Sequence, residues 1–207
     1  MTPPPSQALT EARRRLEAGE LVIHPTESVY GIGGVLEDEA LARLRRLKAR
    51  PVGGFVVLIP SAAWVKGLLG EEGRALASAF WPGALTLVLN DPGDDFHPGG
   101  KAADGTVAVR VPGHPVALEL LAALGRPITS TSANRPGAHP ARSASHARRE
   151  ALDLGSELFA LDAGELPGGP PSTLVRLGPS GPEILRAGPP EMLHSIEAAV
   201  ARKGRTG

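Results

Sequence analysis

Cysteine is absent from the 207 residues of this chain, which excludes disulfide bonds, thiol nucleophiles and cysteine-ligated zinc sites. Aromatic residues make up only 3% of the sequence, so the core must be built mainly from Leu, Val, Ala and Ile, and few rings can stack on the bases of single-stranded nucleic acid. The 22 basic and 22 acidic side chains cancel, which argues against a dedicated non-specific nucleic-acid binder. Any anion-binding site in this chain must therefore be local.

Long hydrophobic runs are also missing. The N-terminal segment MTPPPSQ is short and polar, so we expect neither a signal peptide nor a membrane-spanning helix, and a cytoplasmic location follows. No linker or abrupt change of composition divides the apolar segments. We therefore expect a single domain over residues 1–207, with flexible tails at 1–6 and 202–207.

The spacing of apolar residues predicts both helices and strands. Helices are expected over Ser6–Ala18, from a cap at Asp38 to Pro51, in two short segments before Phe80, over His114–Leu124, from Ser143, and over Pro190–Ala201. Strands are expected at 21–24, 55–60, 84–89, 106–111, 127–131, 157–162, 172–177 and 182–186. Some of these strands are joined by helices and others by loops alone, which predicts an α/β fold with a twisted, mixed parallel and antiparallel sheet flanked by helices.

Loops supply further expectations. The Pro/Gly-rich stretches 91–100 and 164–171 are candidates for mobile loops over a ligand site. GIGG at 31–34 lacks both the G-x-G-x-x-G spacing and the lysine of a Walker motif, so we interpret it as a tight turn.

Four stretches place hydroxyl residues or cations beside glycine or proline at the ends of apolar runs. They are HPTESVYGIGG at 24–34, LKARP at 47–51, AVRVP at 108–112 and STSANRPG at 130–137. Such positions are where α/β proteins build ligand sites. Together these stretches indicate a polyanion-binding enzyme pocket.

The cations of these stretches need a counter-charge. Lys48 and Arg50 lie on the same side of an extended chain, where two like charges repel unless an anion such as a di- or triphosphate neutralises them. The alternative is that both simply complement the dipole at a helix C-terminus. Arg110 and Arg186 lie in apolar strand patterns, where a buried guanidinium needs a phosphate or a carboxylate, which a distant Asp or Glu can also supply.

The hydroxyl residues form three groups. They are Thr26, Ser28 and Tyr30; Thr129 to Ser132 before Asn134; and Ser172 with Thr173. These groups can bind a substrate without ionising, or they can cap helices and form turns. The six histidines have no metal-ligand spacing, and Glu27 is the exceptional acid in the motifs, so any Mg²⁺ is expected to arrive with nucleotide phosphates.

The set of motifs resembles a known family. HPTESVYGIGG, LKARP, FWPGALTLVL, VAVRVPGHP, PITSTSANRPG, PSTLVRL and EILRAG occur in the order found in the YrdC/TsaC family of threonylcarbamoyl-AMP synthases, which act in tRNA modification. The resemblance spans residues 10–190. It implies a YrdC-like fold around a deep positive cavity, in the form without a C-terminal extension.

The resemblance also implies a reaction. ATP, L-threonine and bicarbonate or CO₂ would give threonylcarbamoyl-adenylate and pyrophosphate, with Mg²⁺ carried by ATP and a downstream threonylcarbamoyl transferase complex acting on tRNA. No catalytic side chain is singled out, and the expected work is positioning and charge neutralisation by Lys48 and Arg50. The implied ATP-binding residues are Lys48, Arg50, Ser132, Asn134 and Arg186. The implied residues for threonine and bicarbonate are Thr26, Thr86, Arg110 and Ser172.

Among several departures from the family pattern, one removes a basic contact, and two alternative functions stay open. Gly53 and Gly54 stand where relatives often have a basic residue, which predicts weaker pyrophosphate binding. The first alternative is a protein that binds double-stranded RNA or tRNA in the same cavity without ATP turnover, which the zero net charge disfavours. The second is a carbamoyl-adenylate enzyme acting on other carbamates, whose relatives carry extra modules such as zinc fingers that a cysteine-free chain cannot form.

Overall fold

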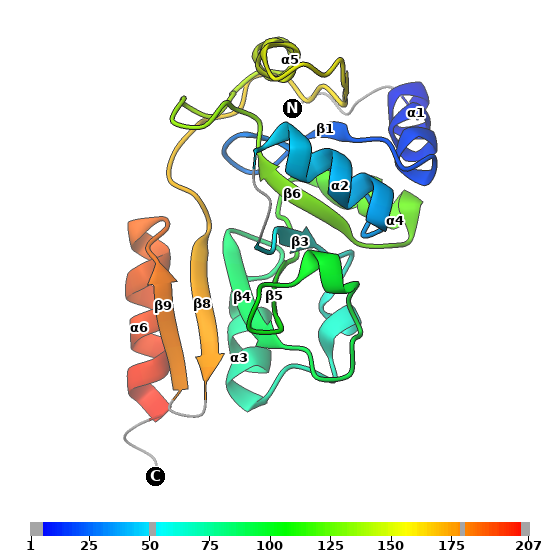
Figure 1. The fold of residues 1–207 in the computed structure, drawn as a ribbon. Helices are drawn as coiled ribbons and strands as arrows, with labels where there is room; N and C mark the ends of the chain where they lie inside the picture. Colours follow the sequence, from blue (N-terminus) through cyan, green and yellow to red (C-terminus); the bar gives the residue numbers. More distant parts are fainter. Residues whose placement is uncertain (1–5, 50–52, 179–180, 204–207) are drawn as a thin grey trace.

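The structure is a computed structural model that describes residues 6–49, 53–178 and 181–203 (Figure 1). Its described strands form a nine-stranded sheet in the order β7-β1-β2-β6-β3-β5-β4-β8-β9. The pairs β1–β7, β3–β5 and β4–β8 are parallel, and the other neighbouring pairs are antiparallel. The predicted mixed sheet flanked by helices is confirmed.

The elements have the following bounds. The strands are β1 (Val22–Pro25), β2 (Tyr30–Gly33), β3 (Val56–Leu58), β4 (Leu85–Asn90), β5 (Thr106–Arg110), β6 (Ile128–Ser132), β7 (Phe159–Ala160), β8 (Thr173–Gly178) and β9 (Gly181–Arg186). The α-helices are α1 (Ser6–Glu17), α2 (Asp38–Leu47), α3 (Glu71–Phe80), α4 (Pro115–Leu124), α5 (Ala144–Asp153) and α6 (Pro190–Lys203), and the 3₁₀ turns are η1 (Ala62–Val65) and η2 (Pro98–Gly100).

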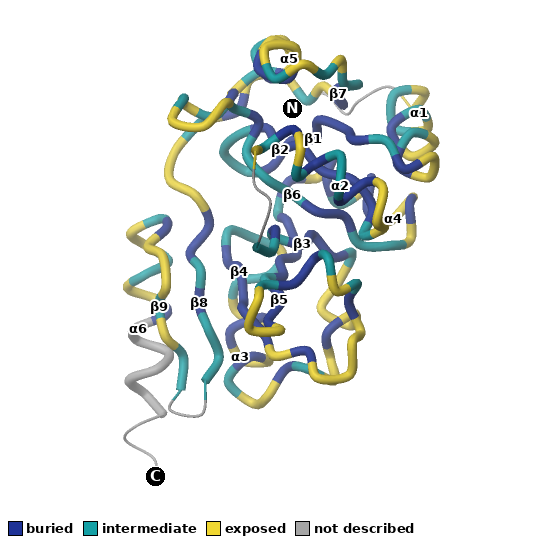
Figure 2. Tube along the Cα trace, in the orientation of Figure 1, coloured by how far each residue is buried: buried dark blue, intermediate teal, exposed yellow. Residues whose placement is uncertain are grey.

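Alternation along the strands distributes apolar side chains between separate parts of the core. Val22 packs in a cluster with Leu16 of α1 and Leu120 of α4, whereas its neighbour Ile23 packs in a cluster with Leu44 of α2. This is the period of two expected of a strand with helices on both faces. A third cluster joins β4, β5 and β8 to α3 and α6, and Figure 2 shows the buried positions concentrated along the strands.

Two local expectations are wrong. Residues 30–33 form strand β2, which pairs with β1 and β6, and not a tight turn. Glycine is required in this strand because a Cβ on Gly33 would lie 1.7 Å from the carbonyl oxygen of Thr129. Glu37, and not Asp38, is the N-cap of α2, and it makes no capping hydrogen bond with its side chain. Asp38 instead begins the helix, where its negative charge is favourable to the helix dipole.

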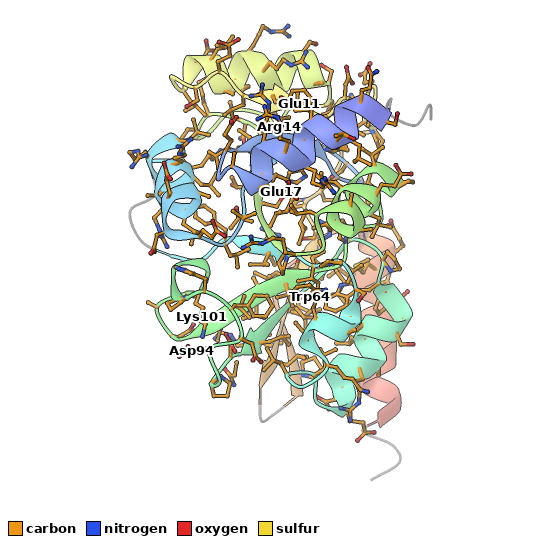
Figure 3. All side chains as sticks on the ribbon, turned by 90° about the vertical axis from the view of Figure 1, so that its right-hand side faces the viewer. Glu11, Arg14, Glu17, Trp64, Asp94 and Lys101 are labelled. Atoms are coloured by element: carbon orange, nitrogen blue, oxygen red, sulfur yellow. The ribbon has the colours of Figure 1, made fainter. Side chains whose placement is uncertain are left out.

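The loop 91–100 does not line the candidate site. Lys101 Nζ lies 2.7 Å from Asp91 Oδ2 and 2.5 Å from Asp94 Oδ1, and Figure 3 labels Asp94 and Lys101 side by side on this loop. Arg45 of α2 donates to the carbonyl oxygen of Gly99 at 2.5 Å. The loop is therefore bound to α2, and Arg45 is partly buried by this contact.

The expected tails fall mostly outside the described residues, although Ser6 begins α1 and α6 extends to Lys203. Among the helices of the described part of the chain, none combines the length and the apolar character needed to cross a bilayer.

Candidate functional site

A cavity of about 420 Å³ lies on one face of the sheet, where strands from both halves of the chain meet. Residues directly opposite one another on neighbouring strands point to the same face. Gly31 lies opposite Ser132, and Leu174 lies opposite Arg186, and all four line the cavity. Its wall includes the following predicted site residues: Thr26, Arg110, Ser132, Ser172 and Arg186.

Arg110 is held in the wall of the cavity by three segments of the chain. Its guanidinium pairs with the carboxylate of Glu27, and its Nε donates to the carbonyl oxygen of Gly83 at 2.8 Å. Glu27 also accepts a hydrogen bond from the main-chain N–H of Gly113. Only 8% of Arg110 is exposed, and a buried guanidinium needs a counter-charge. Glu27 is the acid, distant in the sequence, that supplies it. The signal for Glu27 was present, because it was the exceptional acid in the motifs.

Arg186 ends the edge strand β9 and is exposed at the cavity, which differs from the burial expected of its apolar pattern. Its Nη2 donates to the carbonyl oxygen of Ser172 at 3.0 Å and to Ser172 Oγ at 3.1 Å. No carboxylate pairs with it among the described residues. Although the side chain as a whole is exposed, desolvation of its guanidinium by the surrounding chain, and then the charge of Arg110, lower the pKa of Arg186 from its ordinary value. Arg110 and Arg186 therefore both line the cavity, and none of the described residues that line it is an Asp or a Glu.

Thr86 lies one layer behind the cavity. It is fully buried, and its Oγ1 is 2.7 Å from Ser172 Oγ. Ser172 is 7% exposed and lines the cavity, so Thr86 can orient the hydroxyl of Ser172 without itself reaching the cavity wall.

The predicted ATP-binding residues Lys48, Ser132 and Asn134 surround a turn at the end of β6. We call it the SAN turn (residues 132–138). Ser132 Oγ donates to Asn134 Oδ1 at 2.6 Å, and Asn134 Nδ2 donates to the carbonyl oxygen of Ala138 at 2.6 Å. Lys48, at the end of α2, donates from Nζ to the carbonyl oxygens of Ser132 and Asn134. Lys48, Ser132 and Asn134 are thus brought together, whereas Arg50 lies outside the described residues.

Gly31, at the floor of the cavity, packs against His24, a buried histidine that the sequence did not single out as a site residue. A Cβ on Gly31 would lie 2.9 Å from both His24 Cε1 and Ser130 Oγ, so the missing side chain at Gly31 leaves room for these two side chains. His24 is fully buried; its Nδ1 lies 3.2 Å from the carbonyl oxygen of Pro25, and its Nε2 has no partner among the described residues. Burial lowers the pKa of His24 to about 4, so the ring is neutral at pH 7.

The stretch 164–171 forms part of the rim. The hydroxyl of Tyr30 donates to the carbonyl oxygen of Gly164 at 2.7 Å, and the N–H of Gly168 donates to the carbonyl oxygen of Ser28 at 2.8 Å. Pro171 lines the cavity. This stretch therefore borders the site as expected, and it is bound to β2 and the loop before it.

The site offers few ligands for a metal ion. Within the described residues, no three His, Asp or Glu side chains are grouped so that they could hold a metal ion. The carboxylate of Glu27 is engaged by Arg110 and Gly113, and the other donors around the cavity are hydroxyls, main-chain groups and guanidinium ions. Such a donor set suits an anion better than a bare cation.

Comparison with known proteins identifies the family. A family model described as Sua5/YciO/YrdC, telomere recombination, matches residues 14–188. The chain belongs to this family. A Mycobacterium tuberculosis relative is 40% identical over 194 residues, which cover 89% of this chain and 85% of the relative. A relative from Alkalilimnicola ehrlichii named threonylcarbamoyl-AMP synthase is 38% identical over 190 residues, which cover 88% of this chain and 97% of the relative.

A solved structure is similar in fold. Sua5 of Pyrococcus abyssi, crystallised in complex with L-threonine, superimposes with a TM-score of 0.79 at 34% identity. The similarity covers 93% of this chain and 58% of the Sua5 chain, so this chain spans little more than half the length of that protein. The YrdC-like fold expected from the motifs is confirmed.

Proposed function

We propose that this chain is a threonylcarbamoyl-AMP synthase, which forms threonylcarbamoyl-adenylate and pyrophosphate from ATP, L-threonine and bicarbonate or CO₂. One observation carries the proposal: Arg110, Arg186 and the hydroxyls of Thr26, Ser132 and Ser172 line one cavity. Its volume of about 420 Å³ is typical of small-molecule sites. A relative with this enzyme name, and Sua5 crystallised with L-threonine, support the same assignment.

The proposed site has a threonine end and an ATP end. At one end, Arg110 is fixed by Glu27 and Gly83 and presents a planar fork that matches the carboxylate of an amino acid. Thr26 and Ser172, with Thr86 behind Ser172, complete the proposed threonine end. At the ATP end, Ser132, which lines the cavity, and Lys48 and Asn134, which lie behind its wall, would bind ATP, whereas Arg186, which donates to Ser172, would reach the phosphates from the threonine end. Arg50, the second cation of LKARP, is proposed to join them.

The proposed chemistry asks for positioning and charge neutralisation. The amine of threonine adds to CO₂ and loses a proton, which gives a carbamate; a carbamate oxygen then attacks the α-phosphorus of ATP and pyrophosphate leaves with the electron pair of the broken P–O bond. The cations beside the cavity would stabilise negative charge on the phosphoryl oxygens as this bond breaks. Mg²⁺ would enter as part of the MgATP substrate, because no carboxylate lines the cavity among the described residues and the nearby Glu27 is engaged by Arg110.

The proposed product indicates which enzyme would act after this one. A threonylcarbamoyl-adenylate is an activated acyl donor, so a transferase that moves the threonylcarbamoyl group to tRNA would consume it. This role would place the protein in the cytoplasm. The zero net charge and the small size of the cavity favour the synthase over an RNA-binding protein without ATP turnover.

A direct assay tests the proposal. Purified protein is incubated with MgATP, bicarbonate and each of the amino acids in turn; pyrophosphate is measured, and the adenylate is identified by mass spectrometry. We expect pyrophosphate release that depends on both threonine and bicarbonate. RNA binding with steep salt dependence and no pyrophosphate release would reject the synthase in favour of the RNA-binding alternative.

A further inference from the structure

A buried carboxylate on α5 supports the SAN turn from behind. Glu150 is 5% exposed, and its Oε2 accepts a hydrogen bond from the main-chain N–H of Arg135 at 2.6 Å. The Arg135 guanidinium lies farther from this carboxylate, with both its Nε–Oε2 and Nη2–Oε1 distances at 3.3 Å, and half of its side chain is exposed. The main-chain hydrogen bond is therefore the stronger of the two contacts.

The same peptide group also binds Lys48. The N–H of Arg135 and the carbonyl oxygen of Asn134 belong to one planar peptide group, in which they point in opposite directions. That carbonyl oxygen accepts a hydrogen bond from Lys48 Nζ. The group is thus held between the Glu150 carboxylate and the Lys48 ammonium, and any rotation about its axis would break both hydrogen bonds. Each charge also polarises the group in the sense that strengthens the other hydrogen bond.

We propose that Glu150 is a positioning residue for Lys48, which it acts on through the peptide group between Asn134 and Arg135. The inference rests on the proposed function, in which Lys48 contacts the phosphates of ATP. The pKa of Glu150 lies below its ordinary value, mainly because of the hydrogen bond from the main-chain N–H of Arg135, so the carboxylate stays charged at neutral pH. None of the sequence motifs contains Glu150, because it comes from the following helix and meets the turn only in the folded chain.

Kinetics of pyrophosphate release test the coupling. In Glu150→Ala the KM for ATP should rise about tenfold, whereas the KM for threonine should change by less than about twofold, because the lost hydrogen bond is charge-assisted and acts on the ATP side. Glu150→Gln should recover part of the loss, since its amide oxygen can still accept from Arg135. Arg135→Ala keeps the main-chain N–H and should change the KM for ATP by less than about threefold.

Two controls separate positioning from general damage. Glu37→Ala removes a carboxylate that pairs with Arg126 at 2.7 Å on the surface, and it should leave the KM for ATP unchanged. In a Lys48→Ala background, Glu150→Ala should add little further effect, because a double-mutant cycle isolates the part that acts through Lys48. An unchanged KM in Glu150→Ala, or an undiminished effect in the Lys48→Ala background, would overturn the inference.

A chemical readout makes the test independent of turnover. Acetylation by a soluble reagent, followed by mass spectrometry, measures how freely the Lys48 amine reacts, with the exposed Lys66 as the internal reference. Glu150→Ala should raise the ratio of Lys48 to Lys66 acetylation, and urea unfolding should find the variant folded under these conditions. A wild-type protein without threonine-dependent pyrophosphate release would reject the proposed function, whereas an unchanged acetylation ratio would reject the coupling.

Discussion

Glu27 pairs with Arg110, which lines the cavity, and their hydrogen bonds connect three motifs that are separate in the sequence. Its carboxylate pairs with the Arg110 guanidinium and accepts the N–H of Gly113, while Arg110 Nε donates to the carbonyl oxygen of Gly83. A Cβ at position 113 would lie 3.0 Å from Glu27 Oε1 and 3.2 Å from Gly83 Cα, so a larger residue there would crowd this contact. The orientation of Arg110 is therefore set by the chain before any ligand binds, which is the preorganisation that carboxylate recognition requires.

The first prediction concerns this ion pair. Glu27→Gln keeps the shape of the side chain but removes its charge, which leaves Arg110 less firmly held. The KM for threonine should rise about tenfold, and the KM for ATP should change much less, because Arg110 belongs to the proposed threonine end. Steady-state pyrophosphate release at varied threonine and at varied ATP measures both. Equal increases in the two constants would contradict the division of the cavity.

A second prediction concerns the floor of the cavity. Gly31→Ala would bring a methyl group to 2.9 Å from His24 Cε1 and Ser130 Oγ, so the free energy of unfolding should fall by about 1–3 kcal/mol and threonine should bind more weakly. Gly67→Ala is the matched control, since a Cβ there meets no atom within 4 Å. Urea unfolding and threonine titration of both variants check the prediction, and comparable losses in the control would refute it.

The sequence predicted the sheet wherever a strand had apolar side chains to reveal it. Strands such as 106–110 alternate or run apolar, and their positions are confirmed. Strand β2 was missed because Gly31 and Gly33 have no side chains, so its sequence shows no alternation of apolar and polar residues. The strand order was also out of reach, because it depends on pairings such as that of Val56 with Ser130, which no local pattern contains.

The sequence predicted residues that line the candidate site, but not the ion pairs and hydrogen bonds that hold those residues in place. The motifs named Arg110, Ser132 and Ser172, which the fold brings to one cavity. They did not reveal that Glu27 neutralises Arg110, or that Glu150 lies behind the SAN turn, because these contacts join residues from different elements. Motif reasoning finds side chains that face a ligand, whereas the side chains that hold them in place require the tertiary structure.

The third prediction is a pH dependence of stability that arises from His24. Burial lowers its pKa in the folded state from 6.5 to about 4; the charges of Arg110 and His114 act in the same direction, and Glu27 opposes them. The unfolded chain therefore binds a proton at a higher pH than the folded chain does, so stability is lost as the pH falls from 6.5 towards 4. The loss should be on the order of 3 kcal/mol for this group, with His114 adding in the same sense.

Two histidine variants check this dependence by urea unfolding between pH 7 and pH 4. His24→Phe removes the buried imidazole, so the fall in the free energy of unfolding over this range should be much smaller than in the wild type. His139→Gln changes an exposed ring and should leave the curve as it was. If the His24→Phe curve were as steep as that of the wild type, His24 would not be the source of the acid sensitivity.

The last prediction concerns Arg186 and the leaving group. Arg186 faces the cavity near Arg110 without a carboxylate partner among the described residues, so an anion that binds there meets two cations and displaces no acid from Arg186. Pyrophosphate should therefore raise the melting temperature of the protein, and added salt should weaken the effect. Arg186→Met should bind pyrophosphate about tenfold more weakly while remaining folded, because it removes a charge-assisted contact from an edge strand.

Arg126→Met, a surface control outside the cavity, should retain the full shift in melting temperature. A pyrophosphate-induced shift that survives in Arg186→Met would mean that the leaving group binds elsewhere, and the assignment of Arg186 to the phosphate end would have to be withdrawn.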